Sequence, residues 1–147
     1  MTIVDLAECA GRRYPAGRWT RNLVGGQSPI TSEHFSLGWV VLDPGGGQVP
    51  WHEHPQEEIY LIVEGEGQIC VGSEVRAVRA GQCVSIPPST FHQLTNTGEH
   101  PMTMLYCYAP AGDVAHWRQE LDGTLPRAGV DAPSLPAGAA PQRVEPA

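Results

Sequence analysis

The chain contains no lysine, so all nine of its basic residues are arginines. This absence excludes Schiff-base chemistry and a lysine general base. The arginines are scattered without a stripe or cluster, and the formal net charge is -7. Nucleic-acid-binding proteins carry a basic patch, which is missing here. We therefore expect no nucleic-acid partner.

Long hydrophobic runs are also absent. No window of about eighteen apolar residues, the length needed to cross a bilayer, occurs in the sequence. The first residues, MTIVDLAECAGRR, lack the regions of a secretory signal peptide. The sequence thus predicts a soluble, cytoplasmic protein that makes no membrane contact.

Cysteine is scarce and unpaired in the sequence. Four cysteines occur, with no CxxC spacing: Cys9, Cys70, Cys83 and Cys107. Cytoplasmic thiols usually stay reduced. We expect these four to be mainly buried, small apolar groups, and one of them could still line a pocket.

What the chain does contain is a series of short segments rich in Val, Ile, Leu and aromatic residues, separated by Gly, Pro, Asn and Ser. They run from Glu33 to about Ala109, at the spacing typical of an all-β sandwich or barrel: HFSLGWVVL, VPWHEH, EEIYLIVEG, GQICVG, EVRAVR, QCVSIP, FHQLTN and MTMLYCYA. A length of 147 residues suits one domain. We expect the residues before this core to wrap over the sheet as short strands.

The end of the chain differs in composition. Asp113 is the predicted N-cap of a short helix over VAHWRQEL, at residues 114–121. Residues 122–147 are dense in Ala, Pro and Gly and have too little apolar content to fold alone. The predicted organisation is therefore one domain over 1–121 and a tail over 122–147 that drapes along the surface or is disordered.

The stretch WHEH carries the first sign of chemistry. If it is a strand, the two-residue period places His52 and His54 on one face, with Trp51 and Glu53 on the other. A tight turn at 55–57 would then bring Glu58 level with the two histidines. Two imidazoles with a carboxylate suit Fe, Mn, Ni, Cu or Zn, and the spacing differs from the helical HExxH of zinc proteases.

These residues resemble the first motif of the cupin superfamily, G-x5-HxH-x3,4-E-x6-G. Every position is filled within residues 46–65, by Gly46, His52, His54, Glu58 and Gly65. The second cupin motif, G-x5-PxG-x2-H-x3-N, falls on residues 81–96, where Gly81, Pro87, His92 and Asn96 match. Ser89 stands where the motif usually has glycine, a residue that eases an unusual backbone angle.

The resemblance to a small, single-domain cupin implies a jelly-roll β-barrel with one metal ion inside it. It implies four ligands to that ion: His52, His54, Glu58 and His92. An octahedral ion would keep two positions for water or substrate. Iron is the first choice of metal, with Mn, Ni, Zn and Cu as alternatives.

Residues next to Glu58 face into or out of the barrel according to strand parity. Tyr60 and Ile62 share the inward parity of Glu58. The Tyr60 hydroxyl would then stand within reach of the open metal positions as a catalytic group, or Tyr60 would simply pack the core. Glu57 is one residue off the strand period and should point away from the metal.

The other histidines lie outside both motifs. We expect His34, His100 and His116 to be solvated or to cap other groups, although His34 could reach the barrel mouth. Several apolar residues could line the pocket: Phe91, Met102, Met104, Tyr106 and Tyr108. The parity of MTMLYCYA stays open, so that either the two tyrosines or Cys107 faces the lumen.

The predicted function is that of a metal-dependent enzyme acting on a small organic molecule. The first hypothesis is an Fe(II)-type dioxygenase of an aromatic or enolisable carbonyl compound. The alternatives are a redox-neutral isomerase, lyase or decarboxylase, and a non-catalytic module that binds a sugar or an aromatic acid. Arg76 and Arg79 resemble charges on a hairpin surface, so inward positive charge is short and a phosphosugar substrate is disfavoured.

A homodimer is predicted from the segment EEIYLIVEG. Ile59, Leu61 and Val63 face away from the ligands although Tyr60 already faces inward, so both faces of this strand need cover. Trp51 has the same outward direction. A second subunit would bury this patch, unless the N-terminal segment or the C-terminal helix covers it within the chain.

Overall fold

The computed structural model describes residues 1–144. Residues 145–147 of the predicted tail lie outside the described residues. The described chain forms these elements in order: β1 (Arg12–Tyr14), β2 (Arg18–Val24), β3 (Ser36–Leu42), β4 (Gln48–His52), β5 (Glu57–Glu64), β6 (Glu66–Val71), β7 (Glu74–Arg79), β8 (Cys83–Ile86), β9 (His92–Asn96), β10 (Met102–Ala109) and α1 (His116–Asp122).

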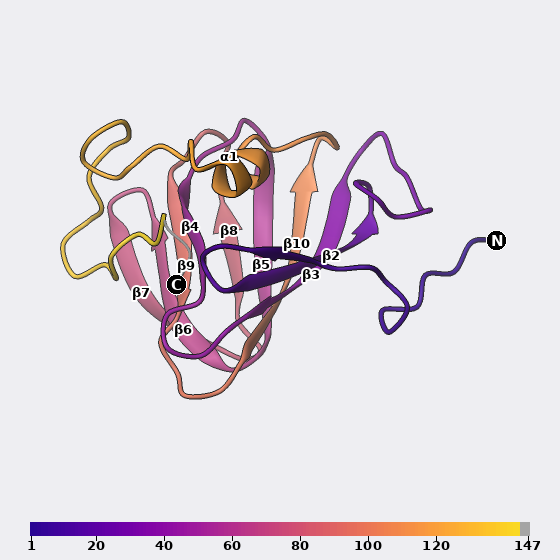
Figure 1. The fold of residues 1–147 in the computed structure, drawn as a ribbon, viewed down its shortest axis with the longest axis horizontal. Helices are drawn as coiled ribbons and strands as arrows, with labels where there is room; N and C mark the ends of the chain where they lie inside the picture. The colour runs from indigo at the N-terminus through magenta and orange to yellow at the C-terminus, as the bar shows by residue number, and fades with distance from the viewer. Residues whose placement is uncertain (145–147) are drawn as a thin grey trace.

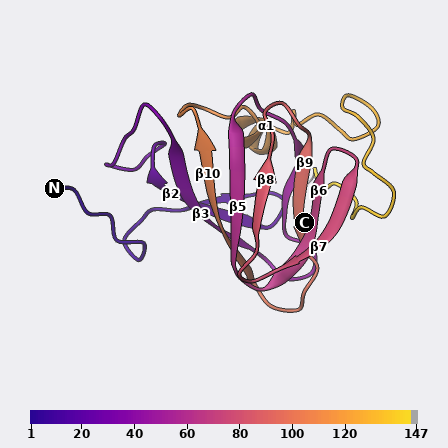
Figure 2. The same ribbon diagram turned by 180° about the vertical axis from the view of Figure 1, so that it is seen from behind.

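The strands build two antiparallel sheets that face each other as a jelly-roll barrel (Figure 1). The larger sheet has the order β1-β2-β3-β10-β5-β8, and the smaller has the order β4-β9-β6-β7. Figure 2 shows β10, β5 and β8 side by side in the larger sheet. The all-β class predicted from the sequence is confirmed, and so are the short strands expected before the core.

Strand alternation creates the space between the sheets. In β3, alternate residues from Ser36 to Leu42 are buried, as expected for a sheet with one face on a core. Val40 and Leu42 from the larger sheet meet Val49 and Leu94 from the smaller one in a single apolar cluster. This cluster gives the barrel a core that does not depend on the polar residues at its open end.

The first motif ends at a turn that requires glycine. Gly65 connects β5 to β6, and thus one sheet to the other, with φ at +85°. A Cβ atom at this position would lie 3.0 Å from the Cα of Met102. Both the left-handed backbone and the close approach exclude larger residues here.

The tail packs on the outer face of the smaller sheet through 144. Backbone carbonyls of the tail accept hydrogen bonds from three glutamine side chains, namely Gln68 to Gly138 at 3.0 Å, Gln93 to Ala140 at 2.8 Å and Gln48 to Pro141 at 2.8 Å. Of the two alternatives predicted for this segment, the structure shows the first, a tail that drapes along the surface. Polar side chains on the sheet thus help to hold the tail there.

Trp51 lies under the tail and is 1% exposed. Its indole N–H donates to the carbonyl of Pro133 at 2.9 Å, and its ring packs against Phe91 with centroids 5.4 Å apart. The indole does point away from the metal ligands, but the expectation about its cover was wrong. Neither the N-terminal segment, the helix nor a partner is needed, because the proline-rich tail supplies both a wall and a hydrogen-bond acceptor.

The short C-terminal helix is present, but its start was misplaced. Ala115 occupies the N-cap and makes no side-chain capping bond. Asp113 pairs instead with Arg118, so its carboxylate is not free to cap the helix. The helix α1 lies across the open end of the barrel (Figure 1), with Val114 and His116 buried beneath it.

The prediction that the four cysteines are mainly buried was partly wrong. All four thiols are free, but only Cys70 is buried, whereas Cys83 on the edge strand β8 is exposed. Cys107 is half-buried on the outward side of β10. In the described part of the chain, no helix has the length and apolar character needed to cross a membrane.

Candidate metal centre

Four ligand-type side chains converge at the end of the barrel that α1 covers. His52 ends β4, Glu58 is the second residue of β5 and His92 begins β9. His54 was predicted to lie on a strand, but β4 stops at His52 and His54 belongs to the following loop. The turn predicted at 55–57 also ends one residue too late, because Glu57 already belongs to β5.

Ser89 holds this loop in place. Its backbone N–H donates to the carbonyl of His54 at 2.8 Å, which ties the loop of the first motif to that of the second. Ser89 has φ at +52°, a left-handed conformation that a non-glycine residue adopts only at some cost. The special backbone angle expected at this motif position is therefore present, although the residue is serine.

The ligand atoms of His52, His54, Glu58 and His92 all lie within 4.8 Å of one another, and all four side chains are buried. Glu58 Oε2 lies 2.9 Å from His54 Nε2 and 3.2 Å from His92 Nε2. The Nε2 atom of His52 is buried without a hydrogen-bond partner among the described residues. Glu57 is exposed and points away, in agreement with its strand parity.

The hydrogen bonds on the far side of each imidazole decide which nitrogen is available. The Nδ1 atoms of His52, His54 and His92 lie 2.7, 3.2 and 2.7 Å from the carbonyl oxygens of Pro50, Gln56 and Thr90. A carbonyl oxygen only accepts, so each Nδ1 donates, and each neutral ring presents Nε2 as an acceptor.

This tautomer makes the centre a good fit for a cation. The Nε2 acceptors of His54 and His92 face the Glu58 carboxylate, which is also an acceptor, and such a pair repels unless a proton or a metal ion lies between the atoms. Burial lowers the pKa of His52 well below its ordinary value, so this imidazole is neutral. Three imidazole nitrogens and one carboxylate oxygen suit a divalent transition metal.

The carboxyl of Glu58 is ionised despite its burial. Burial raises its pKa, but protons at Nε2 of His54 and His92, which stand where a cation would lie, outweigh burial, and the net pKa lies below the ordinary value. The centre therefore supplies one negative charge toward a cation. The sequence-derived ligand set is brought together in full.

Tyr60 lies two residues beyond Glu58, on the same face of β5, and is 2% exposed. Its ring centroid is 5.9 Å from that of His92. Burial, reinforced by the negative charge of Glu58, raises the pKa of the Tyr60 phenol well above its ordinary value. Tyr60 is thus a protonated phenol beside the metal ligands.

A small cavity adjoins the ligands, with about 10 Å³ of free space, which is room for about one water molecule. Met104, Tyr106 and Tyr108 line it, so the tyrosines of β10 face the lumen and Cys107 does not. Phe91 and Met102 do not line this cavity.

His116 was wrongly expected to be solvated or to cap another group. It is 5% exposed, and its ring stacks on that of His52 with centroids 3.7 Å apart. Its Nδ1 lies 2.7 Å from Glu120 Oε1, one helical turn further along α1. The His-x3-Glu spacing in HWRQE was a signal of this pair. His34 and His100 are exposed.

Arg18 is another residue beside the candidate ligands that sequence reasoning missed. It lines the same cavity, is 2% exposed, and Nη2 donates to Glu120 Oε1 at 2.7 Å. Its guanidinium lies over the ring of Tyr14 at 4.0 Å. The predicted shortage of inward positive charge was therefore wrong. Arg18 and Thr20 share the inward parity of β2, and this pattern in the sequence indicated that Arg18 points into the barrel.

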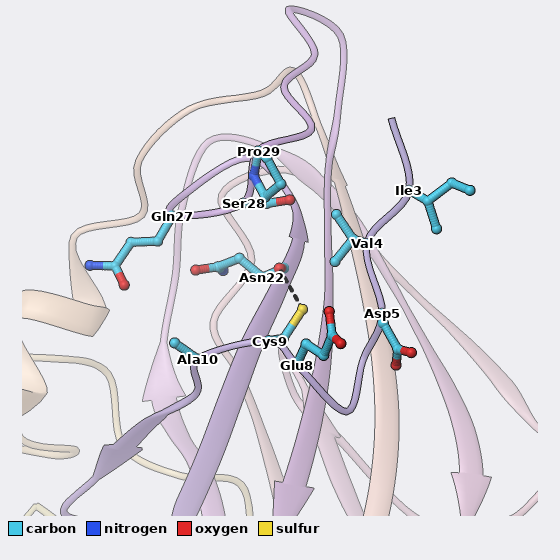
Figure 3. A pocket seen from close by; sticks show the side chains of 10 residues that line it. All are labelled: Ile3, Val4, Asp5, Glu8, Cys9, Ala10, Asn22, Gln27, Ser28 and Pro29. Carbon is cyan, nitrogen blue, oxygen red and sulfur yellow. Dashed lines mark hydrogen bonds between the residues drawn. The ribbon is translucent and has the colours of Figure 1, made fainter. Parts of the chain in front are cut away.

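A larger hollow of about 310 Å³ lies away from the ligands, between the N-terminal segment and β2 (Figure 3). Asp5, Glu8 and Cys9 line it, and the Cys9 thiol points to the carbonyl of Asn22 at 3.9 Å. Only the four ligands described above form a close metal-binding group among the described residues. The candidate metal site therefore lies in the barrel interior and not in this outer hollow.

Comparison with known proteins agrees with the geometry. A family model described as "Cupin domain" matches residues 38–108, which contain all four ligands. An uncharacterised protein of Streptomyces coelicolor is 30% identical over 83 residues, which cover 55% of this chain and 75% of that protein. The chain belongs to the cupin superfamily.

Other relatives differ in length from this chain. An uncharacterised protein of Methanocaldococcus jannaschii is 38% identical over 68 residues, covering 46% of this cupin and 54% of that protein. The dimethylsulfoniopropionate lyase DddQ of Ruegeria pomeroyi is 34% identical over 84 residues, covering 56% of this cupin and 41% of the lyase. This cupin thus spans about half the length of these two relatives.

The crystal structure of the same lyase is similar to this cupin over a longer stretch. The two superpose with a TM-score of 0.62 and 28% identity, over 74% of this cupin and 58% of the lyase chain. The likeness therefore extends beyond the two motifs into the strands that carry them.

Proposed function

We propose that this cupin is a metal-dependent enzyme that transforms a small organic molecule by proton transfer, as a lyase or an isomerase does. The observation that carries the proposal is the position of Tyr60, a buried and protonated phenol on the same strand face as the ligand Glu58. The likeness to a dimethylsulfoniopropionate lyase supports this class.

The four ligand residues would hold a divalent ion, which would act as a Lewis acid on a substrate oxygen. Proton transfer and the exclusion of water would depend on side chains of the protein itself. Tyr60 holds a proton at its hydroxyl and can donate it to a developing anion. Met104, Tyr106 and Tyr108 exclude water from the cavity, and α1 closes its mouth.

The second candidate is the Fe(II)-type dioxygenase. Three histidines and one glutamate in a buried, partly apolar barrel also suit Fe(II), and this donor set supports the candidate. An aromatic or enolisable carbonyl compound that binds through one or two oxygens would be its substrate.

Metal analysis of protein purified without added metal, followed by a substrate screen with an oxygen electrode, separates the candidates. The lyase or isomerase proposal expects product formation with no oxygen uptake. Oxygen uptake in proportion to product would establish the dioxygenase instead. Ligand binding that is indifferent to the metal, with no turnover under any metal tested, would establish a non-catalytic binding module.

A further inference from the structure

Arg18 is an incompletely satisfied cation inside the barrel. Its side chain is 2% exposed, and the guanidinium makes one ion pair, from Nη2 to Glu120 Oε1. The Nε atom of Arg18 is buried without a hydrogen-bond partner, and so is Oε2 of Glu120. An arginine that only supports the fold would use its planar fork to bind a carboxylate through two hydrogen bonds. This pair does not.

Glu120 belongs to the part of the chain that closes the site. Gly123, with φ at +74°, ends the short helix α1 that carries it. The cavity under α1 has room for about one water molecule. An organic substrate needs more room than this closed arrangement gives. Movement of α1, which contributes His116 and Trp117 to the lining, would supply that room and would take Glu120 with it.

Movement of α1 would leave Arg18 without its ion-pair partner. A new anion at the same place would restore charge-assisted hydrogen bonds to the guanidinium and would therefore be favourable. Tyr14 stays beneath the guanidinium because it belongs to β1, which pairs with β2. Arg18 therefore remains aimed into the cavity that His54 and Glu58 line.

We propose that Arg18 binds a carboxylate of the substrate, and that Glu120 occupies this carboxylate position while α1 is closed. This inference rests on the proposed function for the identity of its ligand as a substrate. It narrows the substrate class to a small carboxylic acid that also offers an oxygen to the metal. Arg18 is a specificity-determining residue in this account, and Glu120 is an internal competitor.

Affinity measurements on the full chain loaded with Zn(II) test the proposal. The probes are acetate and benzoate, each compared by calorimetry with its neutral analogue, acetamide or benzamide. We expect at least one carboxylate to bind the wild-type protein about 10-fold more tightly than its amide, a factor equivalent to about 1.4 kcal/mol. Equal binding of acid and amide in both pairs would overturn the proposal.

The Glu120→Gln variant removes the internal competitor and keeps the shape of the side chain. Binding of the preferred carboxylate should tighten about 10-fold, with the amide unchanged, whereas a purely structural Glu120 predicts no gain. Unchanged or weaker carboxylate binding would contradict the proposal. Hydrogen exchange of residues 114–125 should rise in this variant, and in wild type when the carboxylate is added.

The double variant Arg18→Gln/Glu120→Gln removes both charges, so it leaves no buried charge unpaired. Its preference for acid over amide should fall well below that of wild type at equal zinc content, leaving only what carboxylate binding to zinc supplies. Arg118→Gln is the matched control, because Arg118 is an exposed arginine on the same helix that pairs with Asp113. Retained preference in the double variant would overturn the proposal. These affinities do not depend on turnover. A protein that binds the carboxylate as proposed but forms no product would therefore contradict the proposed function and not this inference.

Discussion

The imidazole of His116 stacks on that of His52, with ring centroids 3.7 Å apart and planes inclined by 28°. One ring comes from the helix that covers the barrel mouth, and the other is a candidate metal ligand. Burial lowers the pKa of both rings well below the ordinary value, so two neutral imidazoles are in contact. The cover of the site thus touches the metal centre directly.

Metal content should depend on each of the four ligands. Loss of a group that merely supports a ligand costs about 10–100-fold in metal affinity, so His52→Ala or His92→Ala should cost at least about 100-fold. Elemental analysis after dialysis measures this effect. Glu57→Ala is the matched control for Glu58→Ala, because Glu57 is adjacent but exposed. An empty site in Glu57→Ala and a full one in Glu58→Ala would contradict this ligand set.

Replacement of Tyr60 by Phe should slow turnover without loss of metal. The hydroxyl is the only group removed, and a positioned proton donor contributes about 10²–10⁴-fold in rate. We expect kcat to fall by about 10²-fold, while metal content and fold stay the same. Unchanged kcat would show that Tyr60 only packs the core.

The charge of Glu120 should make stability depend on pH. Burial raises its pKa from 4.5 to about 7, although Arg18 lowers it. Between these two pH values the folded state keeps a proton on Glu120 that the unfolded state releases. The contribution of protonated Glu120 to the free energy of unfolding is therefore complete below pH 4.5 and is lost as pH rises through 7.

Comparison with Glu120→Gln isolates this effect, because glutamine does not titrate. Relative to the variant, the free energy of unfolding of wild type should fall by up to about 3 kcal/mol as pH rises across this window. Urea denaturation at a series of pH values measures it. A wild-type advantage that grows with pH would mean that the Arg18 ion pair outweighs burial.

Ser89→Gly should stabilise the protein. Ser89 has φ at +52°, and a left-handed conformation costs a non-glycine residue about 1–2 kcal/mol. Glycine also increases the backbone entropy of the unfolded chain, which offsets part of the stabilisation. We therefore expect the free energy of unfolding, measured by urea denaturation, to rise by about 0.5–1 kcal/mol. Ser85→Gly, on strand β8, is the control and should destabilise. A loss of stability in Ser89→Gly would show that its side chain matters more than the backbone angle.

We propose that two copies of this cupin associate through the outer face of β5. Ile59, Leu61 and Val63 are 39, 37 and 41% exposed there, a contiguous apolar set on one strand. Leu61→Glu should therefore yield a monomer in sedimentation experiments at micromolar concentration, with metal content unchanged. A monomeric wild type under the same conditions would contradict the proposal.

The two motifs predicted the ligands because strand parity and turn length are local properties. His52 and Glu58 lie where a period of two places them, and His92 lies where the match to the second cupin motif placed it. Even an error in the extent of β4 left His54 among the candidate ligands. Arg18 and Glu120 could not be paired in this way, since they are far apart in sequence and meet only when α1 closes the barrel. Contacts of that kind depend on tertiary packing.

The glutamine-bound tail has a consequence for the order of folding. Its docking surface includes Gln48, Gln68 and Gln93, which come from three different strands, β4, β6 and β9. These side chains reach their relative positions only after the three strands have paired in register. Tail attachment is therefore a late event, and the burial of Trp51 under Pro133 offers a spectroscopic signal of its completion.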